Sequence, residues 1–174
     1  MNIDKLMTKY INGDRSAFEQ VYAQTRNSVY YVALSVLHDR ASAEDAMQST
    51  YLSVLRNADK YTPGTNAAAW IVKIAKNEAL NIRKARSRET SVDETEDETA
   101  FGVTEVDEYG LLVDLAKKLL PEDEFAILML VVSGGYKRRE IADMLEMPVP
   151  TVTWKYNNAL GKMRGALDNK KGGA

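Results

Sequence analysis

The chain has no cysteine and a single histidine, His38, among its 174 residues. Without cysteine it cannot form disulfides, thiolate zinc sites or a cysteine nucleophile, and one histidine cannot supply clustered imidazole ligands. A helical metalloenzyme that pairs glutamates with histidines is excluded for the same reason. Most metal chemistry is therefore excluded, and we expect no metal ion or cofactor.

Long apolar runs are also missing from the sequence. No segment approaches the roughly 20 apolar residues that a membrane-spanning helix needs, and the N-terminus lacks the basic-then-apolar order of a signal peptide. With 45% apolar residues, the chain can still bury a core in one or two small domains. These features predict a soluble, cytoplasmic protein without membrane insertion.

The net charge of -2 hides an uneven distribution of charged residues. Residues 1–88 carry 13 basic and 8 acidic side chains, residues 89–108 carry 0 and 9, and residues 109–174 carry 10 and 8. The acidic segment lacks apolar periodicity, which predicts a flexible, solvated linker between two mildly basic modules. Alternatively, this segment imitates nucleic acid inside a basic channel of a partner, and charge alone does not choose between the two.

The first module is predicted to be all-helical, because it shows no alternating strand pattern. A long helix is expected from about Ser16, with Phe18, Val21, Tyr22, Thr25, Val29, Val32, Ala33 and Val36 on its inner side. A second helix is expected from Ser42, whose hydroxyl can cap the amide of Asp45. Its inner side is predicted to hold Ala43, Ala46, Met47, Thr50, Tyr51, Val54 and Leu55, and its outer side Glu44, Asp45 and Gln48.

A turn follows, in which Pro63 and Gly64 occupy the positions of a type II turn and Asn66 is placed to cap the next helix. That helix is predicted from Ala67 to Arg88.

The exposed positions of this third helix are mostly Lys, Arg and Asn, and they lie near Trp70 and a turn that bears Tyr61. This pattern suits single-stranded or opened nucleic acid, because cations follow phosphates while bases stack or enter small polar pockets. The alternative is that Trp70 packs in the core and the cations keep a surface soluble.

Residues 136–164 have the spacing of a helix-turn-helix. Ile141, Ala142 and Leu145 form one apolar face, the segment 146–150 is too rich in proline to continue that helix, and a new period follows in Val152, Tyr156, Ala159, Leu160 and Met163. In such a motif the second helix enters the major groove, so its first turns hold the candidate base readers. An ordinary helical hairpin remains the alternative.

Several short motifs occur in a characteristic order. They are AFEQVY at 17–22, AEDAMQSTY at 43–51, AWIVKIAKN at 69–77 leading into Arg83 and Lys84, LPE at 120–122, EIA at 140–142 and the segment 150–164. The first group resembles region two, and the second resembles region four, of bacterial RNA polymerase sigma factors of the extracytoplasmic-function group. The resemblance spans nearly the whole chain, except for the acidic linker and the last few residues.

The resemblance implies an all-α protein that is a non-catalytic specificity subunit of RNA polymerase. Residues 1–88 are expected to be region two, which binds core polymerase and recognises and melts the minus-ten element. Residues 89–108 are expected to be the acidic linker, which in such proteins threads toward the active-site and RNA-exit channels. Residues 109–174 are expected to be region four, whose helix-turn-helix recognises the minus-thirty-five element.

The same resemblance implies roles for individual residues. Polymerase binding falls to Glu44, Asp45 and Gln48. Contacts to minus-ten DNA fall to Tyr61, Asn66, Trp70, Lys73, Asn77, Arg83 and Lys84. Contacts to minus-thirty-five DNA fall to Thr151, Thr153, Trp154, Lys155 and Asn158. The implied partners are core RNA polymerase and promoter DNA, and an anti-sigma factor is left open.

The chain departs from this family at two places. The recognition helix has only Lys155 as a basic residue before Lys162, and Asn81 stands where an aspartate is expected. Base recognition is therefore expected to rest on asparagine with adenine and on Trp or Thr with thymine methyl groups. Helical spacing predicts that Trp154 and Asn158 both point away from the core.

Two other classes of protein share some of these features. A sigma-like regulator would bind DNA or polymerase without full initiation activity. A stand-alone helix-turn-helix regulator would need a dimer to span two half-sites, and no long heptad seam is present. The sequence does not determine how the two modules are oriented in the free protein.

Overall fold

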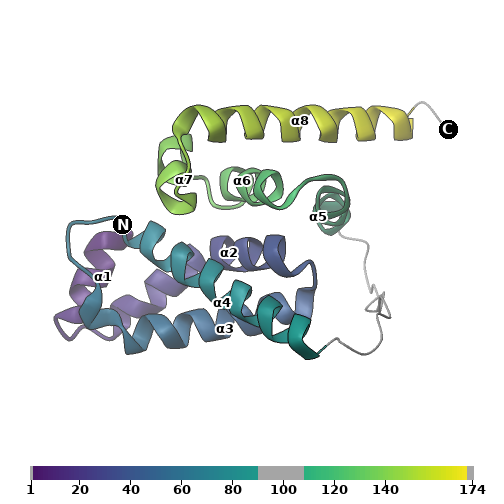
Figure 1. The fold of residues 1–174 in the computed structure, drawn as a ribbon. Helices are drawn as coiled ribbons and strands as arrows, with labels where there is room; N and C mark the ends of the chain where they lie inside the picture. The colour runs from purple at the N-terminus through teal and green to yellow at the C-terminus, as the bar shows by residue number, and fades with distance from the viewer. Residues whose placement is uncertain (1, 90–107, 172–174) are drawn as a thin grey trace.

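The computed structural model describes residues 2–89 and 108–171, and every regular element in these two ranges is a helix (Figure 1). The elements are α1 (Ile3–Ile11), α2 (Ser16–Leu37), α3 (Arg40–Arg56), a short 3-10 turn η1 (Ala58–Lys60), α4 (Ala67–Glu89), α5 (Glu108–Leu119), α6 (Glu122–Val132), α7 (Arg138–Leu145) and α8 (Val149–Lys171). The predicted all-α class is confirmed. Apart from its two end residues, which close α4 and open α5, the predicted linker lies outside the described residues.

The N-terminal helices pack around α2, which begins at Ser16 as the apolar spacing predicted. The sequence did not reveal α1, whose Leu6 and Met7 are fully buried against this core. The predicted cap of α3 is wrong by three residues. Asp39 is the N-cap, and its carboxylate accepts a hydrogen bond from the backbone N–H of Ser42 at 2.9 Å.

The turn before α4 has the predicted geometry. Gly64 has a φ of +87°, which a side chain would disfavour, and the Thr65 N–H donates to the Thr62 carbonyl at 3.3 Å. Asn66 caps α4, because its Oδ1 accepts from the Ala69 N–H at 3.0 Å. The polar positions of α4 are therefore presented by a helix with a defined start.

The C-terminal helices form the predicted helix-turn-helix from α7 and α8. The buried face of α7 includes Ile141, Ala142 and Leu145, and Glu146 ends this helix with a left-handed φ of 55°. Helix α8 starts two residues earlier than the predicted turn at 146–150 allowed, because proline is tolerated in a first helical turn. Figure 1 shows α8 lying across α6 and α7.

The two groups of helices pack against each other, α2 against α6 and α4 against α7 (Figure 1). Val32 and Val72 of the N-terminal helices share a buried cluster with Ile127 and Ile141 of the C-terminal helices. Ion pairs cross the same boundary, at 2.8 Å for Arg40 with Asp114, 2.6 Å for Lys73 with Glu146 and 2.9 Å for Arg83 with Glu122. We call this packing the closed arrangement.

Candidate functional site

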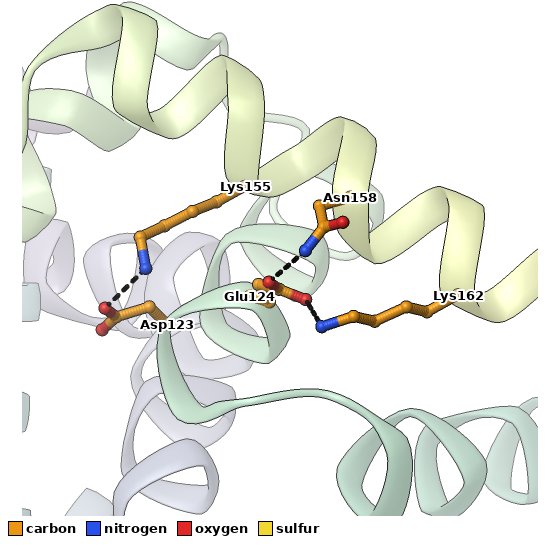
Figure 2. Close-up of polar contacts among 5 residues, drawn as sticks. All are labelled: Asp123, Glu124, Lys155, Asn158 and Lys162. Atoms are coloured by element: carbon orange, nitrogen blue, oxygen red, sulfur yellow. Dashed lines mark hydrogen bonds and ion pairs between the residues drawn. The ribbon is translucent and has the colours of Figure 1, made fainter.

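The recognition helix α8 is held on one flank by two consecutive acids of α6 (Figure 2). The Lys155 ammonium lies 3.1 Å from Asp123 Oδ2. Glu124 accepts a hydrogen bond from Asn158 Nδ2 at 2.6 Å and forms an ion pair with Lys162 Nζ at 2.8 Å. The Glu124 side chain is only 5% exposed, and a buried carboxylate needs such partners because burial removes its hydration.

This geometry corrects one prediction. Asn158 does not point away from the core; it lies on the flank of α8 that faces α6, together with Lys155 and Lys162 (Figure 2). Trp154 does point outward, with 63% of its surface exposed. Thr151 and Thr153 are half-buried, and the Thr153 hydroxyl donates to the Val149 carbonyl at 3.0 Å. The DNA contacts of these residues stay predictions.

Sequence reasoning missed a basic cluster at the start of α7, made of Lys137, Arg138 and Arg139. All are exposed, and the Arg138 guanidinium lies over the Tyr156 ring, 4.8 Å from its centroid. This cation–π contact joins the cluster to α8. The signal was present as three consecutive cations at the beginning of the first helix of the motif.

The candidate minus-ten residues are divided between the core and the surface. Tyr61 is 4% exposed, and its hydroxyl donates to Asp4 Oδ1 at 2.8 Å. Burial, and then this hydrogen bond, raise the pKa of Tyr61 to about 12. The expectation of an accessible Tyr61 is wrong, because the ring fills the core beside α1. Asn66 is half-buried and uses its side-chain oxygen as the cap of α4.

Trp70 is partly buried and packs against the core, and its contact with DNA stays a prediction. Its ring packs near Tyr61, with centroids 5.4 Å apart. It also lines an open hollow of about 310 Å³ between α3 and α4, together with Ser53, Asn57, Lys60, Ile74, Asn77 and Glu78. An aromatic wall beside amides and a lysine can hold a nucleobase by stacking and by hydrogen bonds to its edge.

The candidate cations of α4 are exposed, but two of them are engaged by the C-terminal helices. Lys73 pairs with Glu146, and this hydrogen bond and charge lower the pKa of the Glu146 carboxyl from its ordinary value. Arg83 pairs with Glu122 and also donates to the Val36 carbonyl at 3.5 Å. Lys84 is exposed. The closed arrangement thus occupies two of the cations assigned to minus-ten DNA.

The outer side of α3 presents Glu44, Asp45 and Gln48 to solvent, as predicted. The side chain of Leu55 was expected inside but is 40% exposed, and Leu52 is 55% exposed. With Tyr22, Met47, Gln48 and Tyr51 they line a shallow, mostly apolar groove, which we call the α3 groove. Exposed leucines beside acids are typical of a protein interface, and the helical spacing alone could not separate them from core positions.

Other kinds of site find no support in the described ranges. Within residues 2–89 and 108–171 there is no cluster of three or more His, Asp or Glu side chains arranged to hold a metal ion. Over the same residues, no helix combines the length and the apolar character that crossing a membrane requires.

Comparisons with known proteins agree with this geometry. Residues 21–89 match the family model of sigma-70 region 2. Over 96% of its length the chain is 27% identical to the ECF RNA polymerase sigma factor SigK of Mycobacterium bovis strain BCG, of which it covers 94%. A SigK of Mycolicibacterium vanbaalenii is also 27% identical, over 95% of the chain and 89% of that protein.

Two solved structures share the fold. One is CnrH in complex with the cytosolic domain of CnrY, with a TM-score of 0.67 and 18% identity over 95% of this chain and 97% of that one. The other is RpoE of Bartonella quintana in complex with the anti-sigma factor NepR, with a TM-score of 0.64 and 18% identity over 87% of this chain and 96% of that one.

The region 2 match and the near full-length similarity make bacterial RNA polymerase sigma factors the class of protein that this chain resembles, and the helix-turn-helix of α7 and α8 agrees with that resemblance. Within that class, the relatives that match nearly the whole chain are sigma factors of the extracytoplasmic-function group, and residues 21–89 are the part that matches region 2.

Proposed function

We propose that this chain binds core RNA polymerase in the cytoplasm and directs promoter-specific initiation of transcription, without catalysing a reaction itself. The observation that carries the proposal is the match of residues 21–89 to sigma-70 region 2, because this range contains the α3 groove and the polar hollow beside α4. We assign residues 1–88 to polymerase binding and the minus-ten element, 89–108 to the linker and 109–174 to the minus-thirty-five element.

Reconstitution with core polymerase tests the proposal. Genome-wide run-off transcription with the purified chain is expected to yield discrete start sites that core polymerase alone does not produce. Binding to core or to DNA without new start sites would instead favour a sigma-like regulator that lacks full initiation activity.

The polymerase interface that we propose joins the exposed acids of α3 to the α3 groove. Glu44, Asp45 and Gln48 provide charge and polar contacts at the N-terminal end, and Leu52 and Leu55 provide apolar area one and two turns further along. An apolar centre beside a charged rim is the arrangement that gives an interface both affinity and orientation.

Reversal of the charge at Asp45 is expected to weaken binding to core polymerase. Asp45→Arg places a cation where the partner surface is expected to be basic, which costs about 2 kcal/mol, roughly a thirtyfold loss of affinity. A competition assay for core enzyme measures the change. Asp59→Arg, the same charge change at an exposed position outside the groove, is the matched control. Equal affinities for both variants would remove α3 from the interface.

We also propose that the hollow beside Trp70 holds a base of the opened minus-ten element. The hollow opens between α3 and α4, and Lys60 at its edge can neutralise a phosphate. The Tyr61 ring packs in the core, where its hydroxyl bonds to Asp4, and the Asn66 side chain caps α4. Both residues therefore support the site indirectly, and we do not expect either of them to stack on bases.

Removal of the Asn77 amide is therefore expected to impair promoter opening more than recruitment. Asn77→Ala should slow open-complex formation on duplex promoter by roughly tenfold, as expected for one lost base contact of 1 to 3 kcal/mol. Permanganate footprinting measures opening, and filter binding measures recruitment. Asn81→Ala alters an exposed asparagine of the same helix that does not line the hollow. A defect confined to recruitment would contradict the single-strand role.

An anti-sigma factor is a further partner that we propose for this chain. The support comes from the fold neighbour RpoE, which is described in complex with the anti-sigma factor NepR. Such a partner would compete with core polymerase for the α3 groove or stabilise the closed arrangement.

A further inference from the structure

The flank contacts of α8 decide which of its side chains are free to meet DNA. Lys155 and Lys162 are paired with Asp123 and Glu124, and Asn158 is bonded to Glu124 (Figure 2). Withdrawing Asn158 toward DNA would leave the buried Glu124 carboxylate with one partner fewer, which is unfavourable in a poorly hydrated site. The structure therefore gives Asn158 a place inside the module.

A different asparagine lies on the solvent-facing side of α8. Asn157 is exposed and lies three residues after the outward Trp154, so the two side chains are neighbours on the solvent face of the helix. An asparagine amide can form two hydrogen bonds with the adenine edge in the major groove, and an apolar ring can cover the methyl group of thymine. Both side chains lie in the first turns of α8, the part of a recognition helix that contacts base edges.

Exposed cations near the start of this face lie at the N-terminus of α7. Lys137 and Arg139 are exposed at its first turn, next to Arg138, which stacks on Tyr156 of α8. The first helix of a helix-turn-helix crosses the phosphate backbone while the second lies in the groove. This placement brings phosphate-binding charge to a helix whose Lys155 and Lys162 are held by α6.

We propose that Asn157 and Trp154 of α8 read adjacent A·T pairs of the promoter duplex, and that Lys137 and Arg139 of α7 bind its phosphates, while Asn158 and Lys155 hold the module together. The inference rests on the proposed function, since it assigns the base readers of the minus-thirty-five contact.

Selection by the reconstituted holoenzyme from promoters randomised at the minus-thirty-five element tests the assignment. Wild type is expected to select an adenine next to a thymine. Asn157→Ala should relax the adenine preference about five- to a hundredfold, and Trp154→Ala should relax the neighbouring thymine. Asn158→Ala should keep the wild-type consensus and lower the melting temperature. If it unfolds, Asn158→Gln, which retains an amide beside Glu124, should give the same consensus.

The salt dependence of the affinity for promoter DNA gives a second test of the assignment. The slope of log affinity against log salt should fall by about one for Lys137→Ala and for Arg139→Ala, and it should stay unchanged for Lys155→Ala. A relaxed consensus for Asn158→Ala with an unchanged one for Asn157→Ala, or a salt slope that depends on Lys155 alone, would overturn the assignment. A wild-type holoenzyme that initiates with no minus-thirty-five preference would overturn it too, but would leave the proposed function intact. Failure to initiate at any promoter would reject the proposed function itself.

Discussion

A covalent cross-link between α4 and the C-terminal end of α7 is expected to abolish transcription by the reconstituted holoenzyme. The chain has no cysteine, so Lys73→Cys and Glu146→Cys create the only two thiols, at positions whose native side chains meet at 2.6 Å. A short, reductant-cleavable bis-maleimide across them would lock the closed arrangement. Run-off transcription with core polymerase should fall by at least about a hundredfold, because a locked population has no access to the open state.

The physical reason is that the two promoter elements lie further apart than the closed protein can span. Elements named minus-ten and minus-thirty-five lie about 25 base pairs apart, or roughly 85 Å along the duplex at 3.4 Å per pair. A compact chain of this length has a radius of gyration of only about 16 Å. The closed protein is too small to contact both elements, so under the proposed assignment we expect the two modules to separate on the polymerase.

Cleavage of the cross-link supplies the control, since reduction should restore activity to the level of the uncross-linked double variant. Single variants that carry the reagent on one thiol account for the loss of Lys73 or Glu146 itself. A cross-linked protein as active as the reduced one would mean that initiation proceeds with α4 and α7 in contact.

A glutamate in the α3 groove is expected to have the second large effect. Leu52→Glu removes an apolar side chain that gains about 1.5 to 3 kcal/mol on burial, and it places an unpaired charge in the proposed interface. The combined loss is expected to exceed about 4 kcal/mol, a roughly thousandfold weaker affinity for core polymerase.

Val132→Glu is the matched control for this substitution. Val132 is 57% exposed and Leu52 is 55% exposed, so both changes add the same charge at a solvated aliphatic position. Competition binding to core enzyme, together with circular dichroism to verify folding, separates an interface effect from a general one. Equal binding by the two variants would show that the α3 groove is not part of the polymerase contact.

Features that depend on neighbouring residues were predictable from the sequence. The extents of α2 and α4, the turn at Gly64, the cap at Asn66 and the helix-turn-helix all follow from apolar spacing and from local backbone preferences. The order of the motifs was enough to recognise the family, because it is a property of the chain and not of its packing.

Tertiary structure alone decided which polar and aromatic side chains are free. Asn158 meets a carboxylate 34 residues away, and Tyr61 meets one 57 residues away, so helical spacing could not reveal that either was engaged. The same holds for Lys73 and Arg83, whose partners lie across the closed arrangement. Periodicity determines which face of a helix is apolar, whereas the partner of a polar side chain at the edge of that face depends on elements that only folding brings together.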